Sequence, residues 1–422
     1  MNQSLLTPWI RSKTDCASCA ELDQWQMAKV RDIVAYTREN SPFYQEHLKY
    51  IDTTSLKSHD NLADLPFTTS EQLRENPQAW LCCSATQVER IVTLKTSGTT
   101  SSPKRVFFTA EDLESTVDFF AHGMGELVSP SDKVMILMPA SQTGSVGDLL
   151  SRGLARIGVS SVPAGPVSDI ARNYALLKDS GCTCIVGIPV QVLALAQYGA
   201  HLPTEQRATL KSVLLSADTT PTALIKKIRT LFACEVFTHF GMTELAFGGA
   251  VECGAHQGCH IREADLLVEV VDPVSGRPLP PGQLGEFVIT TLNRQAMPFI
   301  RYRTGDLGTI LPEPCPCGSY IRRMLPYGGR VKDRCGDLSL WDLDNVLFSC
   351  PELVDYTVHI GPDSLTLTLD GIVPPDPSEA RFLLLRSPLA PRLRSRSIQI
   401  QSRAITGFTG TGMQKRTLST NL

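Results

Sequence analysis

The chain has 422 residues, of which 42% are hydrophobic and 20% charged, and its formal net charge at pH 7 is −3. This length predicts two or more domains, and the composition is typical of a soluble globular protein. The charge argues against nucleic acid as the main partner. A membrane-spanning protein is not expected either, because no apolar run approaches the roughly 20 residues that cross a bilayer.

The cysteines indicate a reducing compartment. Their number, 13, is odd, and Met1 to Arg11 lack the layout of a signal peptide. We therefore expect a cytoplasmic protein whose thiols are free or bind metal.

The N-terminal part of the chain predicts helices. Apolar spacing indicates a helix within residues 20–50 that ends at Ser41-Pro42. Thr109 and Asp112 form a candidate capping box that opens a second helix, which is expected to run to Leu127.

The chain then alternates between strands and helices. Strands are expected at residues 134–138, 159–162, 183–186, 211–215 and 234–238. Helices are expected between them at 147–156, 168–179, 189–198 and 221–232. This rhythm predicts a largely parallel sheet covered by helices.

After residue 260 the pattern becomes antiparallel. Strands are expected at 266–271 and 285–291, and turns rich in Pro and Gly separate them. The last 90 or so residues predict a hairpin of strands 354–360 and 365–369, followed by a basic helical stretch within 377–396. We predict an α/β fold with a large N-terminal domain, residues 1–330, whose antiparallel module spans about 250–330, and a small α+β C-terminal domain, residues 331–422.

A polar loop joins two apolar segments, 91–94 and 106–108, that should form a hairpin. The loop reads Thr96-Ser97-Gly98-Thr99-Thr100-Ser101-Ser102-Pro103-Lys104. Its hydroxyls, backbone N–H groups and lysine charge can wrap a polyphosphate. It is not a Walker A loop, because it lacks the pattern G-x-x-x-x-G-K-[ST] and no helix is expected to begin after the lysine. A solvated Ser/Thr turn is the alternative.

The residue order of this loop resembles the phosphate-binding loop of the adenylate-forming enzymes, the superfamily of the acyl-CoA synthetases. Ser101 stands where that family usually has Gly. Three further segments match the family in the same order: Phe240-Gly241-Met242-Thr243-Glu244, Tyr302-Arg303-Thr304-Gly305-Asp306 and Gly329-Arg330. Residues 40–44, 65–70 and 276–306 resemble the phenylacetate–CoA ligase branch.

The resemblance implies roles around the phosphates of ATP. Glu244 would bind Mg²⁺, a hard cation that prefers oxygen, and Thr243 would touch the α-phosphate. The alternative for Glu244 is a charge at a helix N-terminus. The residues expected to cradle the β- and γ-phosphates are Thr96, Ser97, Gly98, Thr99, Thr100 and Lys104.

The resemblance also implies contacts with the nucleoside. Ala217 and Asp218, in Ser216-Ala217-Asp218, match the turn that contacts adenine, and Phe240 and Gly241 belong to the same binding site. Asp306 would accept hydrogen bonds from the ribose hydroxyls, or else cap a turn after Gly305. Arg330 would contact ribose or phosphate near the hinge of a mobile C-terminal domain.

The C-terminal segment departs from the family, which usually carries Gly-Lys-x-x-Arg there. Aligning Gly412 and Arg416 with this motif places Met413 at the position of the lysine that stabilises the adenylation transition state. Methionine has no charge to offer. Lys415, two residues on, would share a strand face with Met413 and is the candidate replacement. Two alternatives are that the enzyme adenylates slowly, or that the chain binds an acyl-adenylate or a nucleotide without forming the adenylate efficiently.

A second set of residues suggests a metal site. Cys253, Cys259-His260 and Cys315-Pro316-Cys317 combine thiols with an imidazole, which suits tetrahedral Zn²⁺. Relatives in the phenylacetate–CoA ligase branch share this layout, which implies a structural zinc on Cys253, His260, Cys315 and Cys317. Cys259 could take the place of His260 as the fourth ligand. The alternative to a zinc site is a set of free thiols. Cys16 and Cys19 lack a second pair nearby and are predicted to be ordinary thiols.

The resemblance implies an AMP-forming acid–CoA ligase. Such an enzyme uses ATP and Mg²⁺ to convert a carboxylic acid, here aryl or related, to an acyl-AMP with release of pyrophosphate. It then passes the acyl group to coenzyme A and releases AMP. Two alternatives stay open: transfer to a carrier-protein thiol or an amine, and a nucleotide-binding homologue with weak or no adenylation. The protein could also form a homodimer, and the sequence leaves this oligomeric state open.

Overall fold

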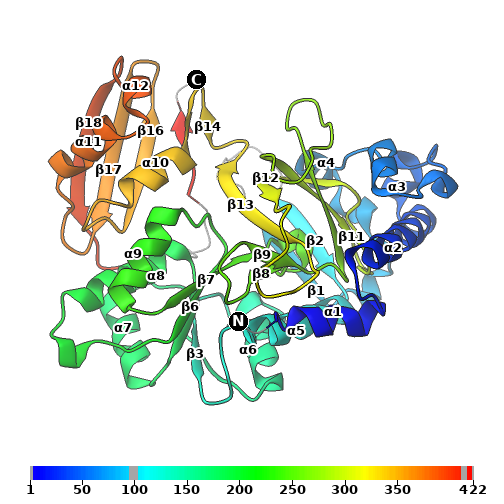
Figure 1. Cartoon of the computed structure of the whole chain (residues 1–422), viewed down its shortest axis with the longest axis horizontal. Coiled ribbons are helices and arrows are strands. Elements are labelled where there is room, and N and C mark those ends of the chain that lie inside the picture. The colour runs from blue at the N-terminus through cyan, green and yellow to red at the C-terminus, as the bar shows by residue number, and fades with distance from the viewer. Residues whose placement is uncertain (1–2, 95–102, 410–415, 421–422) are drawn as a thin grey trace. The chain divides into compact units, whose positions relative to one another are not determined.

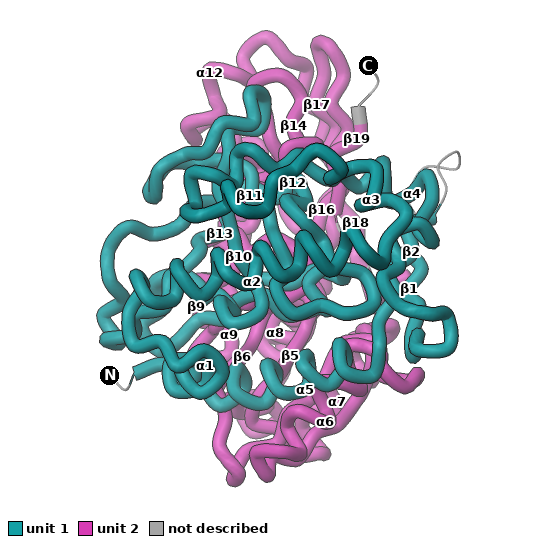
Figure 2. Tube along the Cα trace, turned by 90° about the vertical axis from the view of Figure 1, so that its right-hand side faces the viewer, with its two compact units in different colours: residues 1–126, 240–326 teal, residues 127–239, 327–422 magenta. Residues whose placement is uncertain are grey.

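The computed structural model describes residues 3–94, 103–409 and 416–420 (Figure 1). Several predicted site residues lie outside the described residues: Thr96, Ser97, Gly98, Thr99, Thr100, Met413 and Lys415. The chain divides into two compact units: unit 1 contains residues 1–126 and 240–326, and unit 2 contains residues 127–239 and 327–422 (Figure 2). This division cuts the chain near Arg330 but also at two earlier points, so the boundary after Arg330 stays a prediction.

The helices of unit 1 follow local capping signals. Ser41 ends the second helix and caps the third, which begins at Pro42, a residue suited to the first helical position. The predicted capping box of Thr109 and Asp112 is present, but the helix ends at Met124, three residues before Leu127. The helices are α1 (Leu6–Thr14), α2 (Cys19–Asn40), α3 (Pro42–His47), α4 (Ser70–Glu75) and α5 (Ala110–Met124).

Antiparallel pairs form between β1 and β2, β8 and β9, β9 and β13, β10 and β11, and β11 and β12. The predicted hairpin is confirmed, with Leu94 opposite Lys104. The antiparallel module also forms as predicted, and its strands β10 and β11 have the predicted bounds. The strands are β1 (Arg90–Leu94), β2 (Lys104–Phe108), β8 (Ala250–Glu252), β9 (Cys259–Ile261), β10 (Leu266–Val271), β11 (Gly285–Thr291), β12 (Tyr302–Ile310) and β13 (Arg323–Arg330).

The first part of unit 2 is the predicted parallel sheet. Its strand order is β4-β3-β5-β6-β7, and every neighbouring pair is parallel. All residues of β5 and β6 are buried, as the apolar strands of a covered parallel sheet should be. The elements are β3 (Lys133–Ile136), β4 (Ser160–Pro163), β5 (Cys184–Gly187), β6 (Ser212–Leu215), β7 (Glu235–Phe240), α6 (Val146–Arg156), α7 (Ile170–Asp179), α8 (Pro189–Ala200) and α9 (Thr222–Phe232).

The second part of unit 2 is a four-stranded sheet of order β18-β17-β16-β19, with α10 and α11 on one face (Figure 1). The helical stretch predicted within 377–396 is interrupted, because Pro388 favours extended backbone at Ser387, which has ψ of 169°. The elements are β14 (Arg334–Cys335), β15 (Leu338–Ser339), α10 (Leu340–Leu347), β16 (Asp355–Ile360), β17 (Ser364–Gly371), α11 (Pro377–Arg386), α12 (Ala390–Leu393), β18 (Ser397–Ala404) and β19 (Ser419–Thr420).

Candidate functional site

Glu244 is the centre of a buried polar cluster in unit 1. It lies in a short 3-10 turn, Thr243–Leu245, and only 1% of its surface is exposed. Its Oε1 forms an ion pair with Lys104 Nζ and accepts a hydrogen bond from Tyr302 Oη at 2.8 Å. Three of the motif segments, which are spread over about two hundred residues of sequence, therefore meet at one carboxylate.

The partners of Glu244 keep its carboxylate ionised. Burial on its own raises the pKa of a carboxylic acid, but the charge of Lys104 and the hydrogen bonds from Lys104 and Tyr302 outweigh it, so the pKa of Glu244 is lowered. Burial and the neighbouring carboxylate raise the pKa of Tyr302 well above its ordinary value. Tyr302 is therefore a neutral hydrogen-bond donor at physiological pH. Sequence reasoning quoted Tyr302 within a motif but gave it no role.

A second buried residue that sequence reasoning missed, Arg294, supports this cluster. Its Nη1 donates to the carbonyl oxygen of Glu244 at 3.0 Å, and its Nη2 donates to the Phe107 carbonyl at 3.1 Å. The guanidinium lies 4.2 Å from the centre of the Phe108 ring. Arg294 thus fixes strand β2, which begins at Lys104, relative to the turn that carries Glu244.

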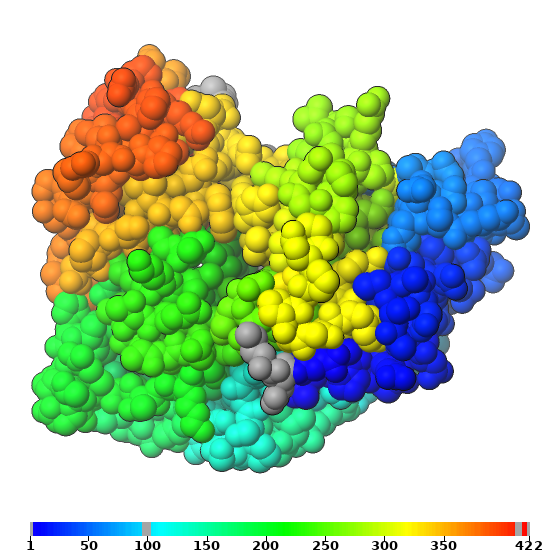
Figure 3. All heavy atoms as spheres, in the orientation of Figure 1, coloured from blue at the N-terminus to red at the C-terminus, as the bar shows by residue number. Residues whose placement is uncertain are grey.

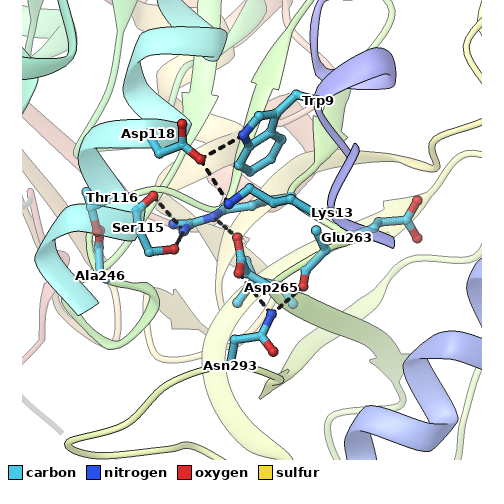
Figure 4. A network of polar contacts seen from close by, with 12 residues as sticks. Trp9, Lys13, Ser115, Thr116, Asp118, Ala246, Glu263, Asp265 and Asn293 are labelled. Atoms are coloured by element: carbon cyan, nitrogen blue, oxygen red, sulfur yellow. Dashed lines mark hydrogen bonds and ion pairs between the residues drawn. The ribbon is translucent and has the colours of Figure 1, made fainter. Parts of the chain in front are cut away.

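The backbone after Glu244 is held in an unusual conformation. Ala246 and Phe247 have φ of 52° and 71°, in the left-handed region that non-glycine residues rarely adopt. Thr116 Oγ1 of α5 donates to the Ala246 carbonyl at 3.0 Å. Figure 4 shows this contact beside the network in which Trp9 and Lys13 meet Asp118 of the same helix. These contacts give α5 a fixed position from which it supports the Glu244 turn.

Asp306 lies in β12, where Gly305 has a φ of 75° and the strand pairing with β11 is irregular. The backbone N–H of Asp306 donates to Thr304 Oγ1 at 3.0 Å. Within the described ranges, the Asp306 carboxylate makes no hydrogen bond or ion pair, and it is partly exposed. It is thus free to accept hydrogen bonds from a ligand.

Phe240, at the end of β7, is buried, and its ring lies 5.6 Å from that of Phe287.

In unit 2 the structure brings Asp218 and Arg330 together. Arg330 Nη2 lies 3.8 Å from Asp218 Oδ1, and Arg330 Nε lies 2.8 Å from Asp333 Oδ2. Both Asp218 and Arg330 were predicted to contact the nucleotide. Ala217, just before Asp218, has a φ of 73°. The turn that was predicted to contact adenine is therefore a strained turn at the carboxyl end of β6.

The strain at Ala217 gives a stability prediction. Left-handed backbone costs an alanine about 1–2 kcal/mol, and glycine adopts it without this strain. Glycine also makes the unfolded chain more flexible, which offsets roughly half of the stabilisation. Ala217→Gly should therefore raise the free energy of unfolding by about 0.5–1 kcal/mol. Urea denaturation measures this. Ala175→Gly is the matched control: Ala175 is exposed inside α7, and glycine there should lower the stability by about 1 kcal/mol. Equal destabilisation by both changes would contradict the prediction.

The predicted metal ligands also lie together, in unit 1. The ligand atoms of Cys253, His260, Cys315 and Cys317 are all within 4.8 Å of one another, and all four residues are buried. Cys253 Sγ lies 3.7 Å from Cys315 Sγ, and Cys317 Sγ lies 3.4 Å from His260 Nε2. Among the described residues, this is the one group of three or more His, Cys, Asp or Glu side chains arranged to hold a metal ion.

The structure distinguishes His260 from Cys259. The two residues are consecutive in strand β9, so their side chains point to opposite faces, and His260 is the one in the cluster. Its Nδ1 lies 3.2 Å from the Ile321 carbonyl, which leaves Nε2 for a metal. Burial lowers the pKa of His260 to about 4, so the imidazole is neutral, as a ligand must be.

Hydrogen bonds join the N-terminal helices to the segment that follows Cys317, and Figure 3 shows the blue N-terminal atoms beside yellow atoms from this part of the chain. Thr7 Oγ1 donates to Ser319 Oγ at 2.7 Å, and Tyr320 Oη donates to the Cys16 carbonyl at 2.7 Å. The Cys19 thiol donates to the Tyr320 carbonyl at 2.8 Å. Cys16 and Cys19 therefore contact Tyr320, three residues after Cys317, and are not part of the four-residue cluster.

Residues 51–294, 244 of the 422 residues, match the family model of the AMP-binding enzymes. The chain belongs to this family. The phenylacetate–coenzyme A ligase of Thermus thermophilus is 30% identical over 346 residues, which are 78% of this chain and 76% of that protein. The phenylacetate–coenzyme A ligase of Aromatoleum evansii is 27% identical over 398 residues, 90% of this chain and 88% of that protein.

The fold matches as well. The crystal structure of 2-hydroxyisobutyryl-CoA ligase in the postadenylation state has a TM-score of 0.80 to this chain at 21% identity, covering 97% of this chain and 91% of that one. The comparisons confirm the predicted superfamily, its phenylacetate–CoA ligase-like branch, the adenylate-forming fold and the prediction of an AMP-forming acid–CoA ligase. In the ranges that the structure covers, none of the helices has both the length and the apolar character needed to cross a bilayer.

Proposed function

We propose that this chain activates an aryl or related carboxylic acid with ATP and passes the acyl group to coenzyme A. In the first step, a carboxylate oxygen attacks the α-phosphorus of ATP, the bond to the pyrophosphate oxygen breaks, and acyl-AMP forms. In the second step, the coenzyme A sulfur attacks the acyl carbon, AMP leaves, and the thiol proton passes to solvent. We also propose a cytoplasmic location, where the 13 thiols would stay reduced.

The meeting of Lys104, Glu244 and Tyr302 carries this proposal. Adenylation builds negative charge around the phosphates, and a buried cation would stabilise it together with a metal ion held by a carboxylate. Lys104 is only 13% exposed, so its charge acts where solvent screens it weakly. Both side-chain contacts of Glu244 among the described residues use Oε1, so Oε2 can accept Mg²⁺.

We propose that Cys253, His260, Cys315 and Cys317 hold a structural Zn²⁺. Three sulfurs and one imidazole nitrogen, all buried, fit the closed tetrahedral site of a structural zinc. Burial raises the pKa of Cys317, but hydrogen bonds from the backbone of Ser4 and Ser319 and from the thiols of Cys315 and Cys253 outweigh it and lower the pKa. Burial raises the pKa values of Cys253 and Cys315, so zinc binding would release the protons of these two thiols. The metal would join two segments about fifty residues apart.

Pyrophosphate exchange into ATP tests the proposed function. The acids should include phenylacetate, benzoate, anthranilate, 2-hydroxyisobutyrate and octanoate, with an acid-free reaction as the control. We expect exchange with at least one aryl acid and, on addition of coenzyme A, AMP and a thioester in equal amounts. Absence of exchange with every acid, in a protein that binds ATP, would contradict the proposal. Exchange without thioester formation would favour a carrier-protein or amine acceptor.

A further inference from the structure

Arg301 is a buried arginine of unit 1 with strained backbone, immediately before Tyr302 in the sequence. Its φ is 46°, in the left-handed region that residues other than glycine rarely adopt, and 2% of its surface is exposed. Such a conformation persists only where the surrounding contacts impose it, and it is common at functional sites. Sequence analysis included Arg301 in a matching segment but gave it no role.

The Arg301 guanidinium joins strand β10 to the segment that precedes α4. It makes a two-pronged pair with Glu269 of β10, with Nε–Oε2 at 3.0 Å and Nη2–Oε1 at 2.9 Å. Its Nη1 donates to the Leu65 carbonyl at 2.7 Å, and the guanidinium carbon lies 4.2 Å from the centre of the Phe67 ring. A planar fork of this kind fixes the direction of the side chain as well as its distance from the partner.

The backbone around Arg301 is fixed as well. Its N–H donates to Thr290 Oγ1 of β11 at 3.0 Å, and its carbonyl accepts from the Thr68 N–H at 3.1 Å. The Thr68 carbonyl accepts from the N–H of Arg303 at 2.9 Å. Thr68 therefore forms a parallel bridge with Tyr302 and bonds to the residues on both sides of it.

The contact made by Tyr302 shows what this backbone supports. Its hydroxyl donates to Glu244 Oε1 at 2.8 Å, and a hydrogen bond weakens steeply when its distance or angle departs from the ideal. The direction of a side chain in a strand follows from the backbone angles beside it. Relaxation of Arg301 to ordinary strand backbone would therefore turn the Tyr302 hydroxyl away from the carboxylate.

We infer that Arg301 is a positioning residue for adenylation, which aims the Tyr302 hydroxyl at Glu244. Its pair with Glu269 holds the left-handed backbone that gives the hydroxyl this direction. The inference rests on the proposed function, in which Glu244 holds Mg²⁺ beside the phosphates. Because Arg301 acts through Tyr302 and not on the substrate, its effect on exchange should depend on the presence of the Tyr302 hydroxyl.

A double-mutant cycle tests this dependence. Pyrophosphate exchange is measured for the wild type, Arg301→Gln, Tyr302→Phe and the variant with both changes, and thermal melting of each reports folding. We expect Arg301→Gln to lower exchange by roughly 10-fold or more in the wild-type background, but by less than about threefold in the Tyr302→Phe background. A side chain that only stabilised the fold would lower exchange by the same factor in both backgrounds.

Arg322→Gln is the matched control for the loss of a paired arginine in unit 1. The Arg322 side chain is 26% exposed and forms ion pairs with Asp23, at 2.6 Å, and with Glu263. Neither partner belongs to the Glu244 cluster. Arg322→Gln should lower the melting temperature but change exchange by less than about threefold at a temperature where the protein is folded.

Two outcomes would overturn the inference while the proposed function stands. One is an equal loss of exchange from Arg301→Gln in the two backgrounds, and the other is exchange within threefold of the wild type in Arg301→Gln itself. Should Arg301→Gln fail to fold, Arg301→Lys and Glu269→Gln are measured in the same cycle and decide by the same comparison. A wild-type protein without exchange would overturn the proposed function and the inference together.

Discussion

Glu244→Gln is expected to lower pyrophosphate exchange by about 10²- to 10³-fold, the size of effect seen when one group that stabilises charge in a transition state is removed. Glutamine keeps the shape of the side chain but loses its charge. Lys104 then loses its ion-pair partner, and Mg²⁺ loses a proposed ligand. Because the pKa of Glu244 is lowered in the fold, the carboxylate is ionised at neutral pH, and the substitution removes a full negative charge there.

Tyr302→Phe is the graded control for this prediction. It removes one hydrogen bond of 2.8 Å to Glu244 but leaves the carboxylate and Lys104 in place. A single hydrogen bond to a charged group contributes roughly 1.5–3 kcal/mol, so exchange should fall by about 10- to 100-fold, less than in Glu244→Gln. Thermal melting of each variant separates loss of activity from loss of folding. Glu244→Gln with more than about a third of wild-type exchange would contradict the role given to Glu244.

Cys317→Ser is expected to remove zinc and to lower the melting temperature by about 10 °C, because zinc binding to a closed site contributes directly to folding. Protein purified without chelators should contain about one equivalent of zinc, and the variant less than roughly 0.3. Cys317 Sγ lies 3.4 Å from His260 Nε2 in the buried cluster, and an alcohol is a much poorer zinc ligand than a thiolate. Elemental analysis and thermal melting measure the two effects.

Cys259→Ser separates the metal from the general cost of changing a buried cysteine. Cys259 is 1% exposed, like Cys253, but its side chain is on the opposite face of β9 from that of His260. This variant should keep its zinc and lose much less stability. An excess of chelator should bring wild-type protein to the melting temperature of Cys317→Ser. Equal zinc content in the two variants would contradict the ligand set.

Signals that act over a few residues were readable from the sequence. Ser41-Pro42 predicted the helix end, and Thr109 with Asp112 predicted the start of α5. The interrupted helix near Pro388 had the same kind of signal, because the residue before a proline avoids helical backbone. The basic helical stretch predicted within 377–396 therefore forms two helices, α11 and α12, in place of one.

Long-range pairs depend on the tertiary fold and could not be read in the same way. Arg416 pairs with Asp344, 72 residues away, and neither residue has a local pattern that announces its partner. Arg294 similarly contacts Glu244 and Phe107 only after folding. Motif order predicted that Lys104 and Glu244 belong to one site, but not that Tyr302 would donate to the same carboxylate oxygen.

The central claim is that an acid passes through an acyl-AMP on its way to the thioester, and isotope transfer tests it most directly. The enzyme would be given the acid that supports exchange, labelled with ¹⁸O in both carboxylate oxygens, together with ATP, Mg²⁺ and coenzyme A. If a carboxylate oxygen attacks the α-phosphorus, the AMP released carries one ¹⁸O and the thioester keeps the other, which mass spectrometry detects. Unlabelled AMP, or label in inorganic phosphate with ADP as the product, would contradict the mechanism.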